Sequence, residues 1–485
     1  MPVDSDTVKA IVEKVLERLE RGKTAEKGIT PPRSGEASPL QLPESLSGAL
    51  KSPDAAVEAA SKAFAEYRSA TLERRRGIIA ALRQVVRAEN ERWSRMAVDE
   101  TGLGRVEDKI AKNRLAAEKT PGVEDLVPSA SSGDHGLVLE EFAPWGIIAA
   151  IIPCTNPIAT VVNNCISMLA AGNAVVFNAH PLAAKVTIDC VKHLNAAVVG
   201  AGGPANLVCT IESPSIETAQ ALMRHPGVAL LVVTGGPAVV KAAFACGKKV
   251  IAAGPGNPPA VVDETADIAK AARAIVAGAG FDNNIVCLDE KEIICVESVA
   301  TDLKAELVKA GGFELSRRDW GRLAQAVLEV PGGPSNEGAP KKAYVGKDAS
   351  VLLAALGMEG VSPRVIFADV DAEDPFVWTE QLMPAIPLVR VKSAAEAIEF
   401  ARRFEGGRRH TAVMHSRNIE KLSAMARVMD CSIFVKNGPG IAGIGEGGEG
   451  HTSFTIAGPT GEGVTSARSF VRLRRCTLVD YFRIV

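Results

Sequence analysis

The sequence predicts an α/β protein in which parallel strands alternate with helices. Apolar runs of strand length at 145–153, 174–178 and 229–233 are separated by segments of helical length and periodicity. Continuous apolar strands of this kind are typical of parallel sheets that helices cover on both faces. At 485 residues, with 44 glycines for tight turns, the chain is too long for one simple core, so two or three domains are expected.

The composition excludes several classes of function. Lysine and arginine total 55 against 57 aspartates and glutamates, so the net charge of −2 provides no field for nucleic acid or an anionic membrane. Nine cysteines scattered through apolar segments fit a reducing compartment, and no C-x-x-C pair or histidine-rich cluster indicates a metal site. Since no secretory signal or uninterrupted apolar run near twenty residues is present, we expect an intracellular, soluble protein.

The first twenty residues predict a separate amphipathic helix. Its apolar residues recur at helical spacing: Val8, Ile11, Val12, Val15, Leu16 and Leu19. Residues 21–46, rich in Pro, Gly, Ser, Thr and Glu, predict a flexible linker. A short helix on a tether cannot bury its own apolar stripe, so we expect it to dock on a partner. The alternative is an ordinary first helix folded back onto the domain.

Beyond the linker, the predicted secondary structure changes several times along the chain. Residues 53–106 have helical periodicity, and 127–139 indicate a hairpin or excursion. In the strand–helix series that follows, Val233-Thr-Gly-Gly-Pro-Ala238 forms a turn that can accept phosphate at a helix N-terminus, with a plain tight turn as the alternative. A second α/β unit starts near residue 252. The tail 464–485 alternates arginine with apolar residues, which suits an edge strand that pairs with another element or subunit.

One cysteine stands at the end of a loop rich in glycine and asparagine. The helix-like segment 266–276 runs into Gly278-Ala-Gly-Phe-Asp-Asn-Asn-Ile-Val-Cys287, and a buried strand is predicted at 291–296. Close to backbone amides, such a cysteine can be an activated thiolate nucleophile. The alternative is a small apolar side chain packed in a loop.

Motifs in a fixed order resemble the aldehyde dehydrogenase superfamily over about residues 47 to 485. They are the Cys287 loop, Pro144-Trp145-Gly146, Pro153 to Pro157, Val233-Thr-Gly-Gly236 and Glu380 to Pro384. Three further motifs resemble its CoA-acylating branch, the propionaldehyde dehydrogenases of bacterial microcompartments and their acetaldehyde relatives: Gly254-Pro-Gly-Asn257, His410-Thr-Ala412 and Gly458-Pro-Thr-Gly-Glu-Gly463. The resemblance implies a Rossmann-type cofactor domain, an α/β catalytic domain and a small β oligomerisation element.

The resemblance also implies a mechanism. Cys287 would attack a short-chain aldehyde, propionaldehyde before acetaldehyde, and the thiohemiacetal would lose hydride to NAD and leave a thioester. The backbone N–H of Cys287 is one expected oxyanion donor. For the second donor, spacing favours Thr155 whereas chemistry favours Asn156, and both stay candidates. His410 would orient or deprotonate a thiol; the alternative is a strand histidine with a satisfied hydrogen bond.

The resolving nucleophile is predicted from a missing carboxylate. Hydrolytic members of the superfamily carry a glutamate that activates water, whereas Ala252-Ala-Gly-Pro-Gly-Asn257 here has none. Loss of a general base slows such a step roughly 10²- to 10⁴-fold. A thiol needs less help than water, so the resemblance implies acyl transfer to CoA. The alternatives are a hydrolytic enzyme with an unrecognised base and an inert protein that serves shell assembly.

Cofactor residues follow from the same resemblance. Glu380 would hold the nicotinamide ribose, with Leu382 in place of the family's phenylalanine, and Thr234 and Gly235 would border the pyrophosphate. His180-Pro181 replaces a family lysine at the adenosine ribose. No arginine or lysine stands beside that turn in the sequence for a 2′-phosphate, which favours NAD, although the choice between NAD and NADP stays open.

The implied organisation assigns every part of the chain. The cofactor domain covers 47–126 and 141–251, and the catalytic domain covers 252–454. Residues 127–140 and 455–485 would form the oligomerisation element of a homodimer or homotetramer. Residues 1–20 resemble an encapsulation peptide, which implies a microcompartment shell protein as partner and a place in the cytoplasm inside a bacterial microcompartment. The sequence leaves the aldehyde chain length and the upstream enzyme open.

Overall fold

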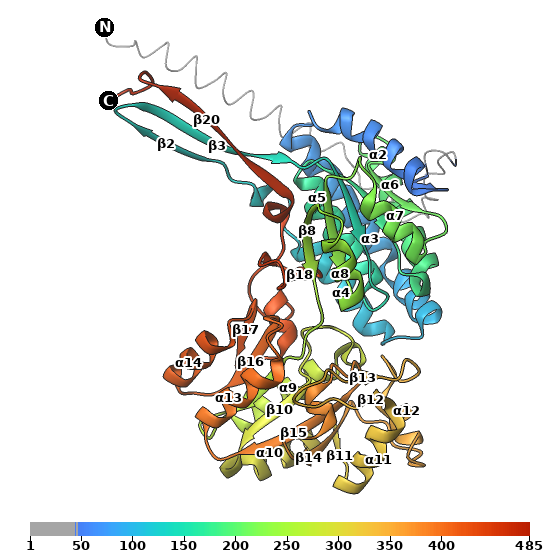
Figure 1. The fold of residues 1–485 in the computed structure, drawn as a ribbon, viewed down its shortest axis with the longest axis vertical. Helices are drawn as coiled ribbons and strands as arrows, with labels where there is room; N and C mark the ends of the chain where they lie inside the picture. The colour runs from blue at the N-terminus through green and yellow to red at the C-terminus, as the bar shows by residue number, and fades with distance from the viewer. Residues whose placement is uncertain (1–43, 45–46) are drawn as a thin grey trace, which may run out of the picture. The chain divides into compact units, whose positions relative to one another are not determined.

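The computed structural model describes residue 44 and residues 47–485 of the chain (Figure 1). The predicted helix at 1–20 lies outside the described residues, as does nearly all of the predicted linker at 21–46. Among the helices that are described, none is long and apolar enough to cross a membrane.

A six-stranded parallel sheet organises the first half of the described chain. Its strands lie in the order β1 (Ala49–Leu50), β6 (Val208–Ile211), β5 (Ala174–Asn178), β4 (Ile147–Ile151), β7 (Leu230–Thr234) and β8 (Lys249–Ala253). Every residue of β4 and β5 is buried, because helices cover this part of the sheet. The strands predicted from the apolar runs are therefore confirmed, with ends shifted by a few residues.

The helices of this half begin and end where the sequence chemistry requires. They are α2 (Pro53–Tyr67), α3 (Leu72–Thr101), α4 (Val106–Lys119), α5 (Pro157–Ala170), α6 (Ala184–Gly200), α7 (Ile216–Arg224) and α8 (Pro237–Phe244). Proline suits the first position of α5, because the N–H that it lacks would have no hydrogen-bond partner within the helix. The helix is buried along its whole length, since it packs between α3, α4 and α6.

A second parallel sheet, of seven strands, organises the other half. The strand order is β11 (Gly312–Glu314), β14 (Val365–Val370), β15 (Ala385–Val391), β10 (Glu292–Val296), β9 (Pro259–Val262), β16 (Thr411–His415) and β17 (Ile433–Lys436). The accompanying helices are α9 (Ile268–Ala279), α10 (Glu297–Lys309), α11 (Arg317–Val327), α12 (Ala349–Ala354), α13 (Ala394–Glu405) and α14 (Ile419–Met429). Two parallel sheets with crossover helices confirm the predicted α/β class.

Antiparallel strands form a small separate sheet. The predicted excursion is the hairpin of β2 (Ser129–Gly133) and β3 (Gly136–Pro144), and the tail adds β20 (Val471–Val479) along β3 (Figure 1). β20 is an edge strand, as its sequence predicted. Short antiparallel pairs occur elsewhere: β12 (Leu328–Val330) with β13 (Ala339–Pro340), and β18 (Ile456–Ala457) with β19 (Gly463–Val464). The predicted domain boundaries themselves stay predictions.

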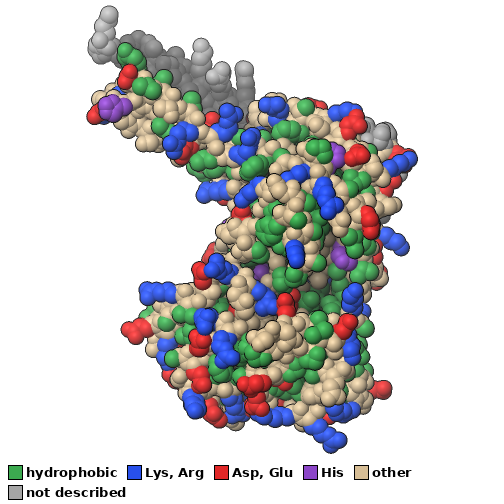
Figure 2. Space-filling view, viewed as in Figure 1, with side chains coloured by type: hydrophobic (Ala, Val, Ile, Leu, Met, Phe, Trp, Pro, Cys, Tyr) green, Lys and Arg blue, Asp and Glu red, His purple; other side chains and the backbone are tan. Residues whose placement is uncertain are grey.

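Charged side chains of both signs are mixed over the visible face of the described residues (Figure 2). This mixture agrees with the near-zero net charge of the whole chain. A surface of this kind lacks a continuous field of one sign, so it favours a small-molecule ligand in a cavity over a polyanionic partner.

Candidate active site

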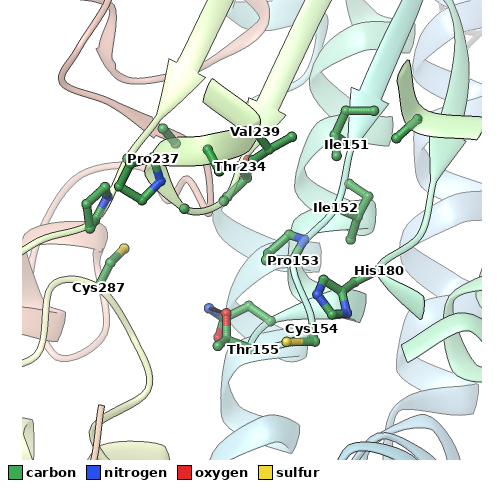
Figure 3. A pocket seen from close by; sticks show the side chains of 18 of the residues that line it. Ile151, Ile152, Pro153, Cys154, Thr155, His180, Thr234, Pro237, Val239 and Cys287 are labelled. Carbon is green, nitrogen blue, oxygen red and sulfur yellow. Dashed lines mark hydrogen bonds between the residues drawn. The ribbon is translucent and has the colours of Figure 1, made fainter. Parts of the chain in front are cut away.

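A cavity of about 600 Å³ opens where the first parallel sheet ends (Figure 3). Strand β4 ends at Ile151 and β7 ends at Thr234, and the segments after both strands line the cavity. Ligands of parallel sheets bind at this carboxyl edge. The cavity brings together nearly all the predicted site residues: Cys287, Thr155, Asn156, Glu380, Leu382, Thr234, Gly235, His180 and Pro181.

The loop before the nucleophile has an unusual backbone. Asp282, Asn283 and Asn284 all take left-handed conformations, with φ of 43°, 57° and 65°. Aspartate and asparagine tolerate this region better than other side chains that carry a Cβ. Asn284 also donates from Nδ2 to the carbonyl oxygens of Ala279 and Glu290, both at 2.9 Å. The asparagine-rich approach to Cys287 is therefore a shaped and hydrogen-bonded turn.

A buried lysine behind this loop escaped the sequence analysis. Lys291 donates from Nζ to the carbonyl oxygen of Asn284 at 2.7 Å, to Asn284 Oδ1 at 2.6 Å and to the carbonyl oxygen of Val286 at 3.3 Å. Its side chain is fully buried, which lowers the pKa of the ammonium group, while Asp289 opposes that shift. The sequence signal was a charged run immediately before an apolar strand, which normally indicates a solvated turn.

Cys287 is partly exposed and lines the cavity. Burial raises the pKa of Cys287 to about 12, the negative charge of Glu380 raises it further, and Lys291 opposes both. The Lys291 ammonium donates to loop carbonyl oxygens and offsets only part of this rise in pKa. Activation of the Cys287 thiol in the reacting complex stays a prediction.

Thr155 and Asn156 share one wall of the cavity, so both oxyanion candidates stay possible on geometry. Asn156 precedes α5 and makes no side-chain capping bond with it. Its Nδ2 donates to Thr155 Oγ1 at 3.2 Å, and its Oδ1 accepts from Lys112 Nζ. The two candidates are thus hydrogen-bonded to each other.

His410 does not line the cavity, unlike the other predicted site residues. The ring is buried, Nδ1 is bonded to Thr411 Oγ1 at 2.8 Å, and Nε2 has no hydrogen-bond partner among the described residues. Burial, followed by the charges of Lys291 and Arg408, lowers the pKa of His410 to about 4, so the ring is neutral at pH 7.

Gly256 lies between His410 and the nucleophile loop. A Cβ at this glycine would be 2.3 Å from the carbonyl oxygen of Cys287 and 3.1 Å from Cγ of His410. Only glycine therefore allows this close approach. The Gly256 N–H donates to the carboxylate of Glu380 at 3.1 Å. Among the residues that line the cavity in the described chain, Glu380 is the only carboxylate.

Two of the cofactor candidates, Thr234 and Gly235, line the cavity where β7 ends. Thr234 Oγ1 is bonded to Thr455 Oγ1 at 3.0 Å, and the Gly235 N–H donates to the carbonyl oxygen of Ala253 at 3.2 Å. The next helix, α8, has Gly236 as its cap and Pro237 as its first residue, and no side chain caps it, so this N-terminus can meet an anion. These features fit the pyrophosphate turn that the resemblance implied.

His180 is held at the start of its turn. His180 Nδ1 accepts from the Leu182 N–H at 3.1 Å. Burial, and then the positive charge of Lys342, lower the pKa of His180. The preference for NAD over NADP stays a prediction.

Comparison with known proteins agrees with this site. Residues 47–312 match the aldehyde dehydrogenase family. The chain is 52% identical over 440 residues to the acetaldehyde dehydrogenase (acetylating) of Escherichia coli (strain K12), covering 90% of this chain and 94% of that protein. It is 46% identical over 439 residues to the propanal dehydrogenase (CoA-propanoylating) of Salmonella typhimurium, covering 90% and 93%.

Two solved structures superpose closely, each with a TM-score of 0.87. One is a Rhodopseudomonas palustris propionaldehyde dehydrogenase with bound CoA and an acylated cysteine, 49% identical, covering 90% of this chain and 98% of that one. The other is a propionaldehyde dehydrogenase from the Clostridium phytofermentans fucose utilisation bacterial microcompartment, 41% identical, covering 90% and 100%.

The fold, the cysteine cavity and these matches define the class: the chain belongs to the aldehyde dehydrogenase family. Within that family it is an enzyme of the CoA-acylating kind, which uses a nicotinamide cofactor and CoA. The resemblance stated from the motifs is confirmed, while the roles of individual site residues stay predictions.

Proposed function

We propose that the enzyme converts a short-chain aldehyde, with propionaldehyde preferred over acetaldehyde, to its acyl-CoA through Cys287. The observation that carries this proposal is the make-up of the cavity wall. The wall combines one partly exposed cysteine with two polar oxyanion candidates, and its single carboxylate is occupied by the Gly256 N–H. Such a wall favours an acyl-enzyme that waits for CoA over one that water cleaves.

In the proposed mechanism each residue has one task. The Cys287 sulfur adds to the aldehyde carbonyl, and the developing oxyanion is met by the N–H of Cys287 and by Thr155 or Asn156. The thiohemiacetal carbon would then give up its hydride to bound NAD, which leaves a thioester on Cys287. Glu380 would hold the nicotinamide ribose, and the turn at Thr234 and Gly235 would hold the pyrophosphate. The thiol of CoA then attacks the thioester carbonyl, and Cys287 leaves as the thiolate.

His410 is proposed to assist the CoA thiol rather than to serve only as a strand histidine. Its neutral ring keeps one nitrogen without a partner among the described residues, and it packs against Gly256 beside the nucleophile loop. A neutral imidazole is the form that can accept a proton.

The preference among aldehydes is tested with a panel of two- to four-carbon aldehydes. We expect kcat/KM to be highest for propionaldehyde and about 10-fold lower for acetaldehyde, since one methylene in an apolar pocket changes kcat/KM by about 10-fold or more. NADH formation at saturating NAD and CoA is the measurement. A higher kcat/KM for acetaldehyde would contradict the propionaldehyde preference and leave the acyl transfer intact.

We also propose that residues 1–20 direct the enzyme to a microcompartment shell. Their amphipathic sequence supports this, as does the microcompartment origin of a structural relative. A variant lacking residues 1–20 should keep its specific activity and lose co-sedimentation with assembled shells. An active variant that still co-sediments would contradict the targeting role, and lost activity would mean that the helix belongs to the fold.

Strand β20 is proposed to contact a second copy of the chain in a homodimer or homotetramer. Several large apolar side chains on and after this strand are exposed by 45% or more: Leu473, Leu478, Val479, Tyr481 and Phe482. A cluster of this kind at a sheet edge marks an interaction surface. Light scattering at micromolar concentration measures the oligomeric state of the enzyme. A monomer would contradict the proposal.

A further inference from the structure

A buried lysine connects the two loops that face the substrate. Lys112 lies on α4 with 1% of its side chain exposed. Its Nζ contacts Oδ1 of Asn156 on the oxyanion wall and Oδ2 of Asp282 on the nucleophile loop. These two partners are far apart in the sequence, one directly before α5 and the other on the nucleophile loop. Lys112 therefore fixes where one loop stands relative to the other.

The carboxylate of Asp282 anchors this connection. It is fully buried, and it also accepts from the Arg105 N–H at 2.6 Å and from Lys109 Nζ at 3.1 Å. The Asp282 N–H donates to Asp108 at 2.9 Å. These bonds tie the nucleophile loop to α4 and to the residue that precedes it.

The charges of the lysines explain why the wall formed by Thr155 and Asn156 takes part in this hydrogen-bonded cluster. Two buried ammonium groups, of Lys109 and Lys112, share one carboxylate, so each keeps N–H groups that this carboxylate does not accept. An unpaired buried charge is costly unless neutral acceptors meet it. The carbonyl oxygen of Thr155, 3.3 Å from Lys109 Nζ, and Oδ1 of Asn156 supply those acceptors.

The chemistry of lysine then determines which way the Asn156 amide faces. An ammonium group can only donate hydrogen bonds, so the amide must turn its oxygen toward Lys112. The NH₂ group is consequently turned the other way, toward Thr155 Oγ1 at 3.2 Å and the cavity that both residues line. Because the Thr155 hydroxyl accepts this bond, its own hydrogen is free to donate.

We propose that Lys112 is the positioning residue of the oxyanion site. It orients the amide of Asn156 so that N–H donors face the aldehyde oxygen. The ammonium also polarises the amide, which strengthens its N–H groups as donors. This inference rests on the proposed function of Cys287 and of the Thr155–Asn156 wall.

A double-mutant cycle tests the proposal. The variants are Lys112→Met, Asn156→Ala and the combination, and the readout is the pre-steady-state rate of NADH formation at saturating NAD. Loss of one oxyanion donor typically lowers the rate 10²- to 10³-fold, so we expect about 10²-fold for Asn156→Ala and about 10-fold or more for Lys112→Met. If Lys112 acts through Asn156, the double variant is no slower than Asn156→Ala.

Two controls separate positioning from a general structural role. Alkylation of Cys287 by iodoacetamide forms no oxyanion, so its rate should change less than about threefold in Lys112→Met if the loop is intact. Lys109→Met removes an equally buried ammonium that contacts Asp282 but not the Asn156 side chain, and it should slow NADH formation less than Lys112→Met. Lys112→Gln, which keeps an N–H donor, should recover part of the rate.

Specific outcomes would overturn the inference. Multiplicative losses in the double variant, or alkylation that slows in parallel with turnover in both Lys112→Met and Lys112→Gln, would make Lys112 a structural residue. A slow Asn156→Ala with an unchanged Lys112→Met would also overturn it. A fast Asn156→Ala would instead move the donor role to Thr155 and reject the route through Asn156. Activity retained without Cys287 is the separate result that rejects the proposed function.

Discussion

Replacing Cys287 with alanine should lower NADH formation from aldehyde, NAD and CoA by roughly 10⁴-fold or more. The size of the effect follows from the chemistry, because without the sulfur neither the thiohemiacetal nor the thioester can form. Cys287 is partly exposed at the cavity, where the loop of three left-handed residues presents it. Steady-state NADH absorbance in the presence of both cosubstrates is the measurement.

Cys154 provides the matched control for this experiment. It lines the same cavity on the wall near His180 (Figure 3), and burial raises the pKa of its thiol as well. Cys154→Ala should therefore keep its turnover within a few-fold of the unmodified enzyme. Loss of activity in Cys154→Ala together with retention in Cys287→Ala would mean that Cys154 is the nucleophile and Cys287 is not.

Omitting CoA should stop the enzyme after one turnover. With aldehyde and NAD alone we expect a burst of about one NADH per active site, followed by a rate roughly 10²- to 10⁴-fold below that with CoA. The reason is that the segment from Ala252 to Asn257 carries no carboxylate and that Glu380 already accepts the Gly256 N–H. Stopped-flow absorbance resolves the burst from the later rate.

The addition of CoA after the burst supplies the internal control. It should restore rapid NADH formation and release acyl-CoA in equal amount, which mass spectrometry can follow. Sustained NADH formation without CoA, at a rate near that with CoA, would instead identify a hydrolytic enzyme with a base on this wall.

Strand positions could be predicted because they depend on local patterns. Both strands of the 145–178 region are continuous apolar runs, and such runs occur almost only where helices cover both faces of a sheet. The Cys287 loop could be located for a similar reason, since three successive left-handed residues require aspartate, asparagine or glycine. Backbone geometry of this kind is visible in the sequence itself.

Buried charges could not be predicted in this way. Lys112 stands in a helix with acidic and basic neighbours, a pattern typical of a solvated face, and its partner Asp282 is 170 residues away. The charge of Lys342, which is similarly distant along the sequence, acts on His180. The raised pKa of Cys287 likewise depends on burial and on Glu380, which only the folded chain brings near the sulfur.

The backbone at Gly256 limits how this site could acquire a water-activating base. A side chain there would place its Cβ 2.3 Å from the carbonyl oxygen of Cys287, so a new carboxylate at this position would displace the nucleophile itself. Ala253 ends β8 and lines the same cavity as Cys287. Close packing of the glycine segment thus narrows the substitutions by which an acyl-transfer enzyme of this design could turn into a hydrolase.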